Sequence, residues 1–206
     1  MKQVLFKIAN YLVGKLNCAD DFSKLEGIDM KNYDGDEKRF KRLKKALLLL
    51  PDNVLESLKN NQVTIIYSKN AKNVYDGKYS GFYVPSEQLI YIWDSGNRSI
   101  YWQVITILHE VGHFVDFTLG GGQGFKSCID VDFHEICIDE QKYYNKFTTK
   151  EGNYYTSNIK EYFAQSFAEY FLVPGFKTRC PETTKYIDSL LSSDKWSVKT
   201  AQQKIA

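Results

Sequence analysis

The chain has 206 residues, of which 43% are hydrophobic and 15% aromatic, so it can bury one substantial core. Lysine and arginine number 27 against 25 aspartate and glutamate residues, which gives a net charge of +2. This balance gives no electrostatic reason to expect a polyanion, and we expect no nucleic acid among the partners. The composition therefore predicts a single soluble globular unit.

The N-terminal stretch MKQVLFKIANYLVGKL is interrupted by Lys7, Asn10 and Lys15, and no small-residue cleavage site follows it. We interpret it as an amphipathic helix and not as a signal peptide. No run in the chain approaches the roughly 18 apolar residues that a membrane-spanning helix needs. The sequence therefore predicts no membrane span.

The spacing of the four cysteines excludes two kinds of site. No two of them form a Cys-x-x-Cys pair, which argues against a cysteine-ligated zinc ribbon and against a thioredoxin-type redox motif. We expect buried free thiols because a fold of this size does not need disulfides, although the even number also permits two of them. The cysteines are Cys18, Cys128, Cys137 and Cys180.

Helical spacing appears first in the segment DGDEKRFKRLKKALLLLPDNVLESLKNN. Phe40, Leu43 and Leu47 recur at helical intervals between charged residues, and Pro51 with Asp52 marks the start of a second helix. We expect the lysine and arginine cluster around Phe40 to be the solvated face of the first helix and not a phosphate-binding stripe.

Strand patterns follow these two helices. The segment QVTIIYS (62–68) is short and β-branched, and GFYVPSEQLIYIW (81–93) is typical of a second strand region broken near Pro85. Because proline cannot donate a hydrogen bond to a neighbouring strand, Pro85 indicates a sheet edge.

The second half of the chain is expected to be mostly helical. Helical spacing returns from Tyr101 to Phe117, and LGGGQG then marks a helix end and a loop. Residues 126–156 are mixed and rich in tyrosine. Two further helices are expected, in NIKEYFAQSFAEYFLVPG (158–175) and in CPETTKYIDSLLS (180–192).

The segment ILHEVGHFVD (107–116) contains the pattern with the clearest chemistry. His109 and His113 stand four residues apart, so on a helix they project from the same side and can hold one metal ion. Glu110, rotated by one residue, can reach a water molecule on that ion. His-Glu-x-x-His is specific for a short motif, and a metal satisfies both histidines at once. We predict a metal site in preference to a core helix with unrelated histidines.

A catalytic zinc ion normally has three protein ligands and a fourth position for water. The pattern His-Glu-x-x-His-x-x-Gly-x-x-His is excluded, because Asp116 and Leu119 occupy its glycine and third-histidine positions. A downstream glutamate is the remaining common ligand, and the candidates are Glu135 and Glu161. We favour Glu161 because its helix carries aromatic residues that can pack it rigidly, and we expect Glu135 to be a surface residue.

HEVGHFVD followed by NYYTSNIKEYFAQSFAEYF resembles the catalytic domain of the anthrax lethal factor family of zinc metallopeptidases, which includes the clostridial Pro-Pro endopeptidases. The likeness continues upstream through GFYVPSEQLIYI to LPDNVLESLKNNQVTI and downstream through CPETTKYIDSLL. The resemblance implies that the third ligand is Glu161, which opens the E-[YF]-F-A-x-x-F helix. It also implies that Tyr154, seven residues earlier, assists the transition state.

The chain departs from the family pattern in two places. Gln165 stands where the family usually has a glutamate that supports a ligand histidine, and glutamine can accept a hydrogen bond but brings no charge. The connection from Tyr75 to Ser99 is shorter than the substrate loop of the Pro-Pro endopeptidases, which leaves proline preference open. EYFAQSFAEYFLVP is also similar to a helix of intracellular repressor-cleaving peptidases of mobile elements, which use the same histidine motif.

Together these observations predict a zinc-dependent endopeptidase of α+β class. We expect a zincin-like domain with a small sheet packed on helices and the metal helix beside the sheet. Zn²⁺ is the expected cofactor, Glu110 the general base and Tyr154 the oxyanion donor, and Asp116 and Gln165 are expected to support the ligand histidines. The predicted metal ligands are His109, His113 and Glu161.

The expected substrate is an extended peptide or protein segment lying along an edge strand near residues 81–93. The expected organisation is an N-terminal helical extension (1–31), a metallopeptidase domain (32–192) and a frayed tail (193–206), in a monomer. The family resemblance implies a secreted, toxin-like protein, whereas the N-terminus shows no signal peptide. The alternative from another class is a catalytically silent module that retains zinc for structure.

Overall fold

The structure is a computed structural model that describes residues 16, 21–33, 36–68, 80–93, 100–145, 156–193 and 196. It is a mixed α+β protein with a small four-stranded sheet and many helices. The chain divides into two compact units, Met1–Glu110 and Val111–Ala206, and each is described by itself. Helix α4 (Ile100–Leu119) runs without interruption through the border between the two units.

The first unit consists of the sheet and the helices that cover it. Besides the first half of α4, its elements are η1 (Ser23–Leu25), β1 (Asp29–Asn32), α2 (Glu37–Leu47), α3 (Asp52–Asn60), β2 (Thr64–Ser68), β3 (Gly81–Val84), η3 (Pro85–Glu87) and β4 (Leu89–Trp93).

The sheet has the strand order β1-β2-β4-β3. β1 and β4 both pair with β2 in parallel, whereas β3 pairs antiparallel with β4. The 3-10 turn η3, which opens with Pro85, joins β3 to β4 and produces the expected break within residues 81–93. Among the described strands, β3 therefore lies at one edge of the sheet, and it is the only antiparallel one.

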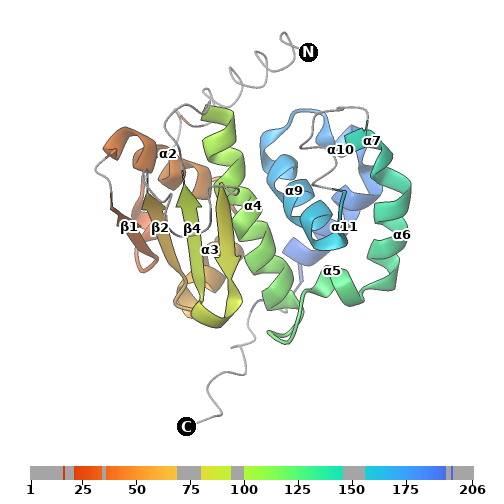
Figure 1. Ribbon diagram of the computed structural model, residues 1–206, viewed down its shortest axis with the longest axis horizontal. Helices are drawn as coiled ribbons and strands as arrows, with labels where there is room; N and C mark the ends of the chain where they lie inside the picture. The colour runs from red at the N-terminus through yellow and green to blue at the C-terminus, as the bar shows by residue number, and fades with distance from the viewer. Residues whose placement is uncertain are drawn as a thin grey trace. The chain divides into compact units, whose positions relative to one another are not determined.

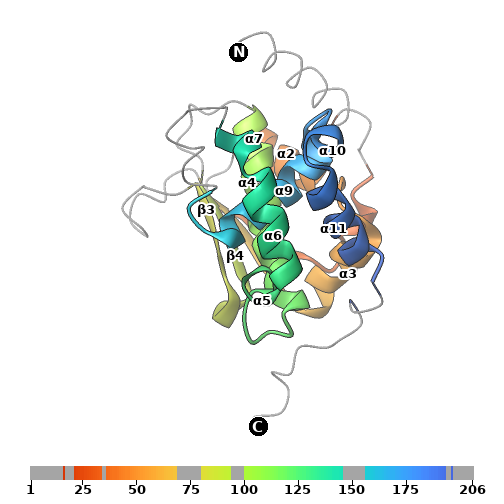
Figure 2. The ribbon, with the colours of Figure 1, turned by 90° about the vertical axis from the view of Figure 1, so that its right-hand side faces the viewer.

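One face of the sheet packs against helices. Ile65 and Tyr67 of β2 and Ile90 and Ile92 of β4 are buried, as the two-residue side-chain period of a strand requires. Helices α2 and α3 lie on this face, which two perpendicular views show (Figures 1 and 2). Their apolar side chains recur at helical spacing and are buried: Phe40, Leu43, Ala46 and Leu47 in α2, and Val54, Leu55 and Leu58 in α3.

The second unit is helical throughout its described part. After the second half of α4, its elements are α5 (Lys126–Ile129), α6 (Val131–Glu140), α7 (Lys142–Asn145), α9 (Ile159–Leu172), α10 (Phe176–Arg179) and α11 (Pro181–Leu191).

An aromatic cluster forms the core of this unit. Phe133 of α6 packs on Tyr186 of α11 with 4.5 Å between ring centroids. Its ring also lies 5.5 Å from Phe163 and 5.9 Å from Tyr162, both on α9. Glu140, at the end of α6, accepts hydrogen bonds of 3.0 Å from the backbone N–H groups of residues 182 and 183 at the start of α11. These contacts pack α6, α9 and α11 against one another.

Helices α4 and α9 approach each other very closely at one glycine. A Cβ atom added to Gly112 would lie 2.9 Å from the Cα atom and 3.0 Å from the carbonyl oxygen of Ala164. These neighbours are backbone atoms, which cannot rotate away as a side chain can. The contact therefore requires a residue without a side chain at position 112 of α4.

The structure corrects several expectations drawn from the sequence. Residues expected to be mixed form the helices α5 to α7, and α4 extends beyond both ends of the predicted helix 101–117. Strand β1 spans residue 31, where the expected domain border lies, and pairs with β2; the expected division of the chain stays a prediction. Cys128, Cys137 and Cys180 are free thiols, as expected, but only Cys180 is buried, whereas Cys137 is half-buried and Cys128 is exposed; Cys18 lies outside the described residues.

No helix in the described ranges is both long and apolar enough to cross a membrane.

Replacing Gly112 with alanine should destabilise the protein, because the new methyl group would overlap the backbone of α9. Overpacking of this kind typically costs about 1–3 kcal/mol. Chemical denaturation should show this loss as a lower midpoint. Gly124→Ala is the matched control, since nothing lies within 4 Å of a Cβ atom at that position. Equal midpoints for the two variants would show that the helix contact tolerates the methyl group.

Candidate metal centre

Three side chains predicted as metal ligands lie together. One ligand atom from each of His109, His113 and Glu161 can be chosen so that the three atoms lie within 4.8 Å of one another. The two histidines stand one turn apart on α4, and Glu161 stands in the first turn of α9. Among the described residues, this is the group of histidine, cysteine and acidic side chains whose geometry could hold a metal ion.

One donor–donor distance in the group matches that of a tetrahedral zinc site. The Nε2 atom of His113 lies 3.5 Å from the Oε2 atom of Glu161. Two atoms that each lie about 2.0–2.1 Å from a tetrahedral zinc ion are roughly 3.4 Å apart. Two imidazoles and one carboxylate also form a donor set that catalytic zinc sites use, with the fourth position left for water.

The backbone of Glu161 is fixed by the cap of its own helix. Asn158 is the N-cap of α9, and its side-chain oxygen accepts a 3.0 Å hydrogen bond from the backbone N–H of Glu161. Farther along the same helix, Ala164 packs against Gly112 of α4. Glu161 is therefore held at both ends of the helical turn that carries it.

Aromatic packing orients the second histidine. The ring of Phe125 lies edge-on to His113, with 5.9 Å between centroids and 77° between planes. Phe117 packs on the same ring at 5.6 Å, and the Nζ atom of Lys160 lies 5.1 Å from its centroid. Phe125 was not singled out in the sequence, because it lies in the loop after α4 and has no periodic signal.

Asp116 is buried and bonds to the segment that follows the glycine-rich loop. Its Oδ1 atom accepts a 2.7 Å hydrogen bond from the backbone N–H of Ser127, and its Oδ2 atom accepts one of 2.5 Å from the Ser127 hydroxyl. Burial raises the pKa of Asp116 to about 6, and the two hydrogen bonds from Ser127 oppose that rise. These bonds tie α4 to α5, while support of a ligand histidine by Asp116 stays a prediction.

Gln165 is also buried, one turn after Glu161. Its Nε2 atom donates a 2.8 Å hydrogen bond to Oε1 of Glu169, and burial raises the pKa of that carboxyl group. The family pattern has a glutamate at position 165, whereas in this chain the next glutamate along α9 is Glu169, one turn later. Whether Gln165 supports a ligand histidine stays a prediction.

The remaining predicted residues are placed as follows. Glu110 lies on α4 and is only 5% exposed. Glu135 lies on the exposed face of α6 and is not part of the metal group, so the structure favours Glu161 among the two candidates. Tyr154 and its neighbour Tyr155 lie outside the described residues.

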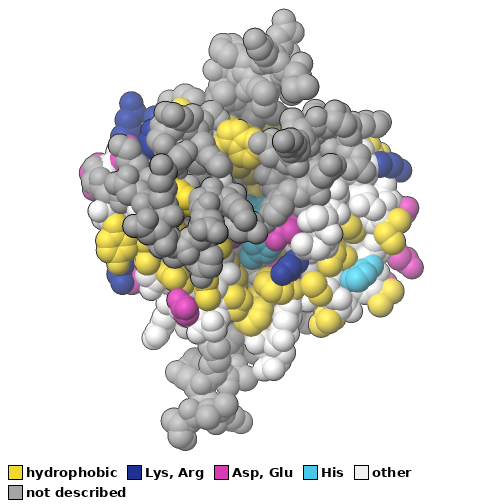
Figure 3. Space-filling view, in the orientation of Figure 1, with side chains coloured by type: hydrophobic (Ala, Val, Ile, Leu, Met, Phe, Trp, Pro, Cys, Tyr) yellow, Lys and Arg dark blue, Asp and Glu magenta, His cyan; other side chains and the backbone are white. Residues whose placement is uncertain are grey.

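The metal group is buried but not sealed. His109, His113 and Glu161 each retain 8% exposure. In the space-filling view, histidine atoms are visible beside an acidic side chain and close to hydrophobic side chains (Figure 3). A small part of each of these three side chains therefore remains exposed.

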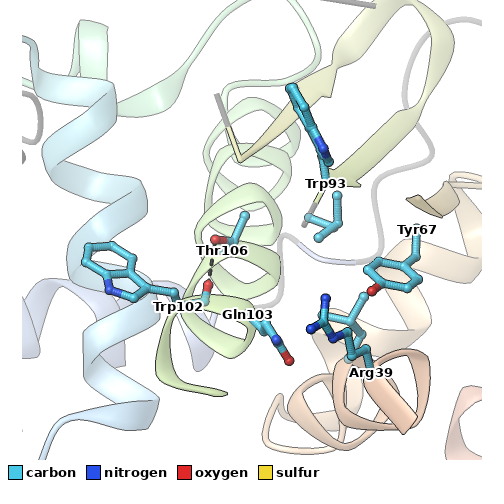
Figure 4. A pocket seen from close by; sticks show the side chains of 8 residues that line it. Arg39, Tyr67, Trp93, Trp102, Gln103 and Thr106 are labelled. Atoms are coloured by element: carbon cyan, nitrogen blue, oxygen red, sulfur yellow. Dashed lines mark hydrogen bonds between the residues drawn. The ribbon is translucent and has the colours of Figure 1, made fainter. Parts of the chain in front are cut away.

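A small pocket lies elsewhere in the first unit. Side chains of α2, β2, β4 and α4 line it, and Arg39 and Tyr67 face Gln103 and Thr106 across it (Figure 4). Neither His109 nor Glu110 lines this pocket, so it is separate from the metal ligands.

Comparisons with known proteins agree with the motif. A family model described as "Anthrax toxin lethal factor, N- and C-terminal domain" matches residues 49–190, which is more than half of the chain. The match includes α4, α9 and all three clustered residues. A search of curated proteins gave no match.

Replacing Glu161 with alanine should remove the metal, because two histidines on one helix would be left as the only protein ligands. We expect stoichiometric zinc in the unaltered protein purified without chelator, and near-complete loss in Glu161→Ala, measured by elemental mass spectrometry. Glu135→Ala is the matched control and should keep its zinc. Loss of zinc in Glu135→Ala with retention in Glu161→Ala would transfer the third ligand to α6.

Proposed function

Because the chain belongs to the anthrax toxin lethal factor family, a family of zinc metalloproteases, we propose that it is a zinc-dependent endopeptidase. The proposed substrate is an extended segment of a protein. The observation that carries the proposal is the buried group of His109, His113 and Glu161, with Glu110 next to the first histidine. We include in this proposal a zincin-like arrangement, in which the metal helix α4 lies beside the sheet.

The residues of the group have two tasks in the proposed reaction, metal binding and proton transfer. His109, His113 and Glu161 would hold the ion, which when bound polarises the scissile carbonyl and lowers the pKa of water toward about 7. Glu110 accepts the proton of the attacking water and passes it to the leaving amine. Glu110 is only 5% exposed, so bulk water has little access to its carboxylate.

The substrate would bind along the edge strand β3. The backbone N–H of Trp93 donates to the carbonyl of Ser80, which makes these two residues a hydrogen-bonded pair. By the alternation of an antiparallel ladder, Phe82 also bonds to β4, whereas Gly81 directs its N–H and C=O groups away from β4, to the side where the described sheet has no further strand. An extended peptide can pair with these groups. β4 lies between β2 and β3, so only β3 of the segment 81–93 is available as an edge.

Family membership supports a toxin-like role for this peptidase. Two alternatives are weighed against it. An intracellular repressor-cleaving peptidase would share the histidine motif, but the family match extends over residues 49–190. A module that retains zinc only for structure would normally need a fourth protein ligand, and the described residues group only three.

Replacing Glu110 with glutamine should abolish cleavage but keep zinc, because this carboxylate acts on the water molecule and not on the ion. Glutamine has nearly the same shape and cannot accept the proton. A peptide library digested by each protein and read by mass spectrometry measures cleavage, and elemental analysis measures zinc. Cleavage by the variant at the original rate would show that Glu110 is not the general base.

We also propose that the hydroxyl group of Tyr154 donates a hydrogen bond to the oxyanion. Loss of one such donor typically costs about 100- to 1000-fold in kcat. Tyr154→Phe should therefore lower kcat by about a hundredfold or more with little change in KM, and zinc content should not change. Tyr155→Phe is the matched control and should be nearly silent. If Tyr155→Phe were instead the damaging change, the position carried over from the family would be wrong by one residue.

A further inference from the structure

Gly81, the first residue of the edge strand β3, lies against the predicted general base. A Cβ atom at this position would lie 2.9 Å from both Cγ and Oε1 of Glu110. It would also lie 2.9 Å from Cγ2 of Thr106, one turn earlier on α4. Real Cβ atoms essentially never have contacts this short, so any side chain at residue 81 must displace one of these neighbours.

Backbone conformation does not explain this glycine. The φ angle of Gly81 lies outside the positive range that favours glycine, and the residue pairs with Ile92 as an ordinary strand residue. Alanine at a site with a compatible backbone normally stabilises a protein, because it reduces the freedom of the unfolded chain. What requires glycine here is the space taken by Glu110 and Thr106.

The two neighbours differ in how easily they can move. Thr106 is held in place, because its hydroxyl donates a 2.7 Å hydrogen bond to the carbonyl oxygen of Trp102 (Figure 4). Rotation of its methyl group away from residue 81 would break that bond. Glu110 has a longer side chain whose carboxylate can rotate. An added methyl group at residue 81 would therefore push mainly on the carboxylate of Glu110.

The same residue also offers backbone groups to a substrate. Gly81 directs its N–H and C=O groups away from β4, as the pairing of Ser80 with Trp93 requires, and the described sheet has no further strand on that side. A peptide that pairs with β3 at this point passes beside the Glu110 carboxylate. Gly81 thus links the position of the substrate backbone to the position of the base.

We propose that Gly81 is a positioning residue for the general base. Its missing side chain lets the carboxylate of Glu110 lie under the edge strand, within reach of the peptide bond that pairs there. This role rests on the proposed peptidase function. It makes a specific claim about residue 81, namely that any side chain there harms catalysis more than it harms folding or metal binding.

The test compares Gly81→Ala with the unaltered protein and with Gly124→Ala, whose new Cβ atom meets nothing within 4 Å. We expect kcat of Gly81→Ala on a peptide cleaved by the unaltered protein to fall about tenfold to a hundredfold, since small displacements of catalytic groups have effects of this size. KM, zinc content and melting temperature should stay close to those of the Gly124→Ala control.

A double variant identifies the cause. Gly81→Ala combined with Thr106→Ser removes the methyl group of residue 106 but keeps its hydroxyl bond to Trp102, which gives the Glu110 carboxylate room to return. We expect it to recover a large part of the lost kcat. A crystal structure of zinc-loaded Gly81→Ala, which does not depend on activity, should show the Glu110 carboxylate displaced from residue 81.

Several outcomes of these experiments would overturn the proposed role of Gly81. An undisplaced Glu110 in the crystal, or a kcat equal to that of Gly124→Ala, would overturn the proposal. Loss of zinc or a much lower melting temperature in Gly81→Ala would show that the glycine serves the fold, which also overturns it. If the unaltered protein cleaved no peptide while the crystal showed the displacement, the peptidase function would fail and the steric coupling would stand.

Discussion

The close contact between α4 and α9 at Gly112 and Ala164 is the constraint on which the metal centre depends. Two helix backbones can approach this closely only where neither carries a large side chain. Gly112 directly precedes His113, and Ala164 lies one turn after Glu161, so the contact brings these two donors to 3.5 Å. Because backbone atoms make the contact, the separation of the donors does not rely on flexible side chains.

Buried charge in the second unit is stabilised by backbone donors. Glu140 accepts two N–H groups at the start of α11, and Asp116 accepts the N–H and hydroxyl of Ser127. Asn158 caps the backbone N–H of Glu161 at the start of α9. A carboxylate that is buried without hydrogen-bond partners lowers the stability of the fold. The bonds of Glu140 and Asp116 avoid this loss and also join neighbouring helices.

In the first unit, the sheet brings edge strand β3 next to Glu110 of α4, the residue proposed as the general base. β3 is antiparallel to β4 and lies at the end of the described sheet, so alternate backbone groups point outward. Gly81 is both the first residue of this strand and the one against which the Glu110 carboxylate packs. In the proposed reaction, Gly81 would therefore contact both the bound peptide, through its backbone, and the Glu110 carboxylate that transfers the proton.

The sequence by itself determined the local features: helical spacing placed His109 and His113 on one side of a helix with Glu110 beside them, and β-branched runs predicted β2 and β4. It also favoured Glu161 over Glu135 as the third ligand, but it showed neither the pairing of β1 with β2 nor the need for glycine at residue 81. Only the tertiary structure decided these points, because each depends on contacts between segments far apart in the chain. The spacing of apolar residues shows which side of a helix or strand is buried. It does not show which other helix or strand packs against that side, because that depends on contacts between distant parts of the chain.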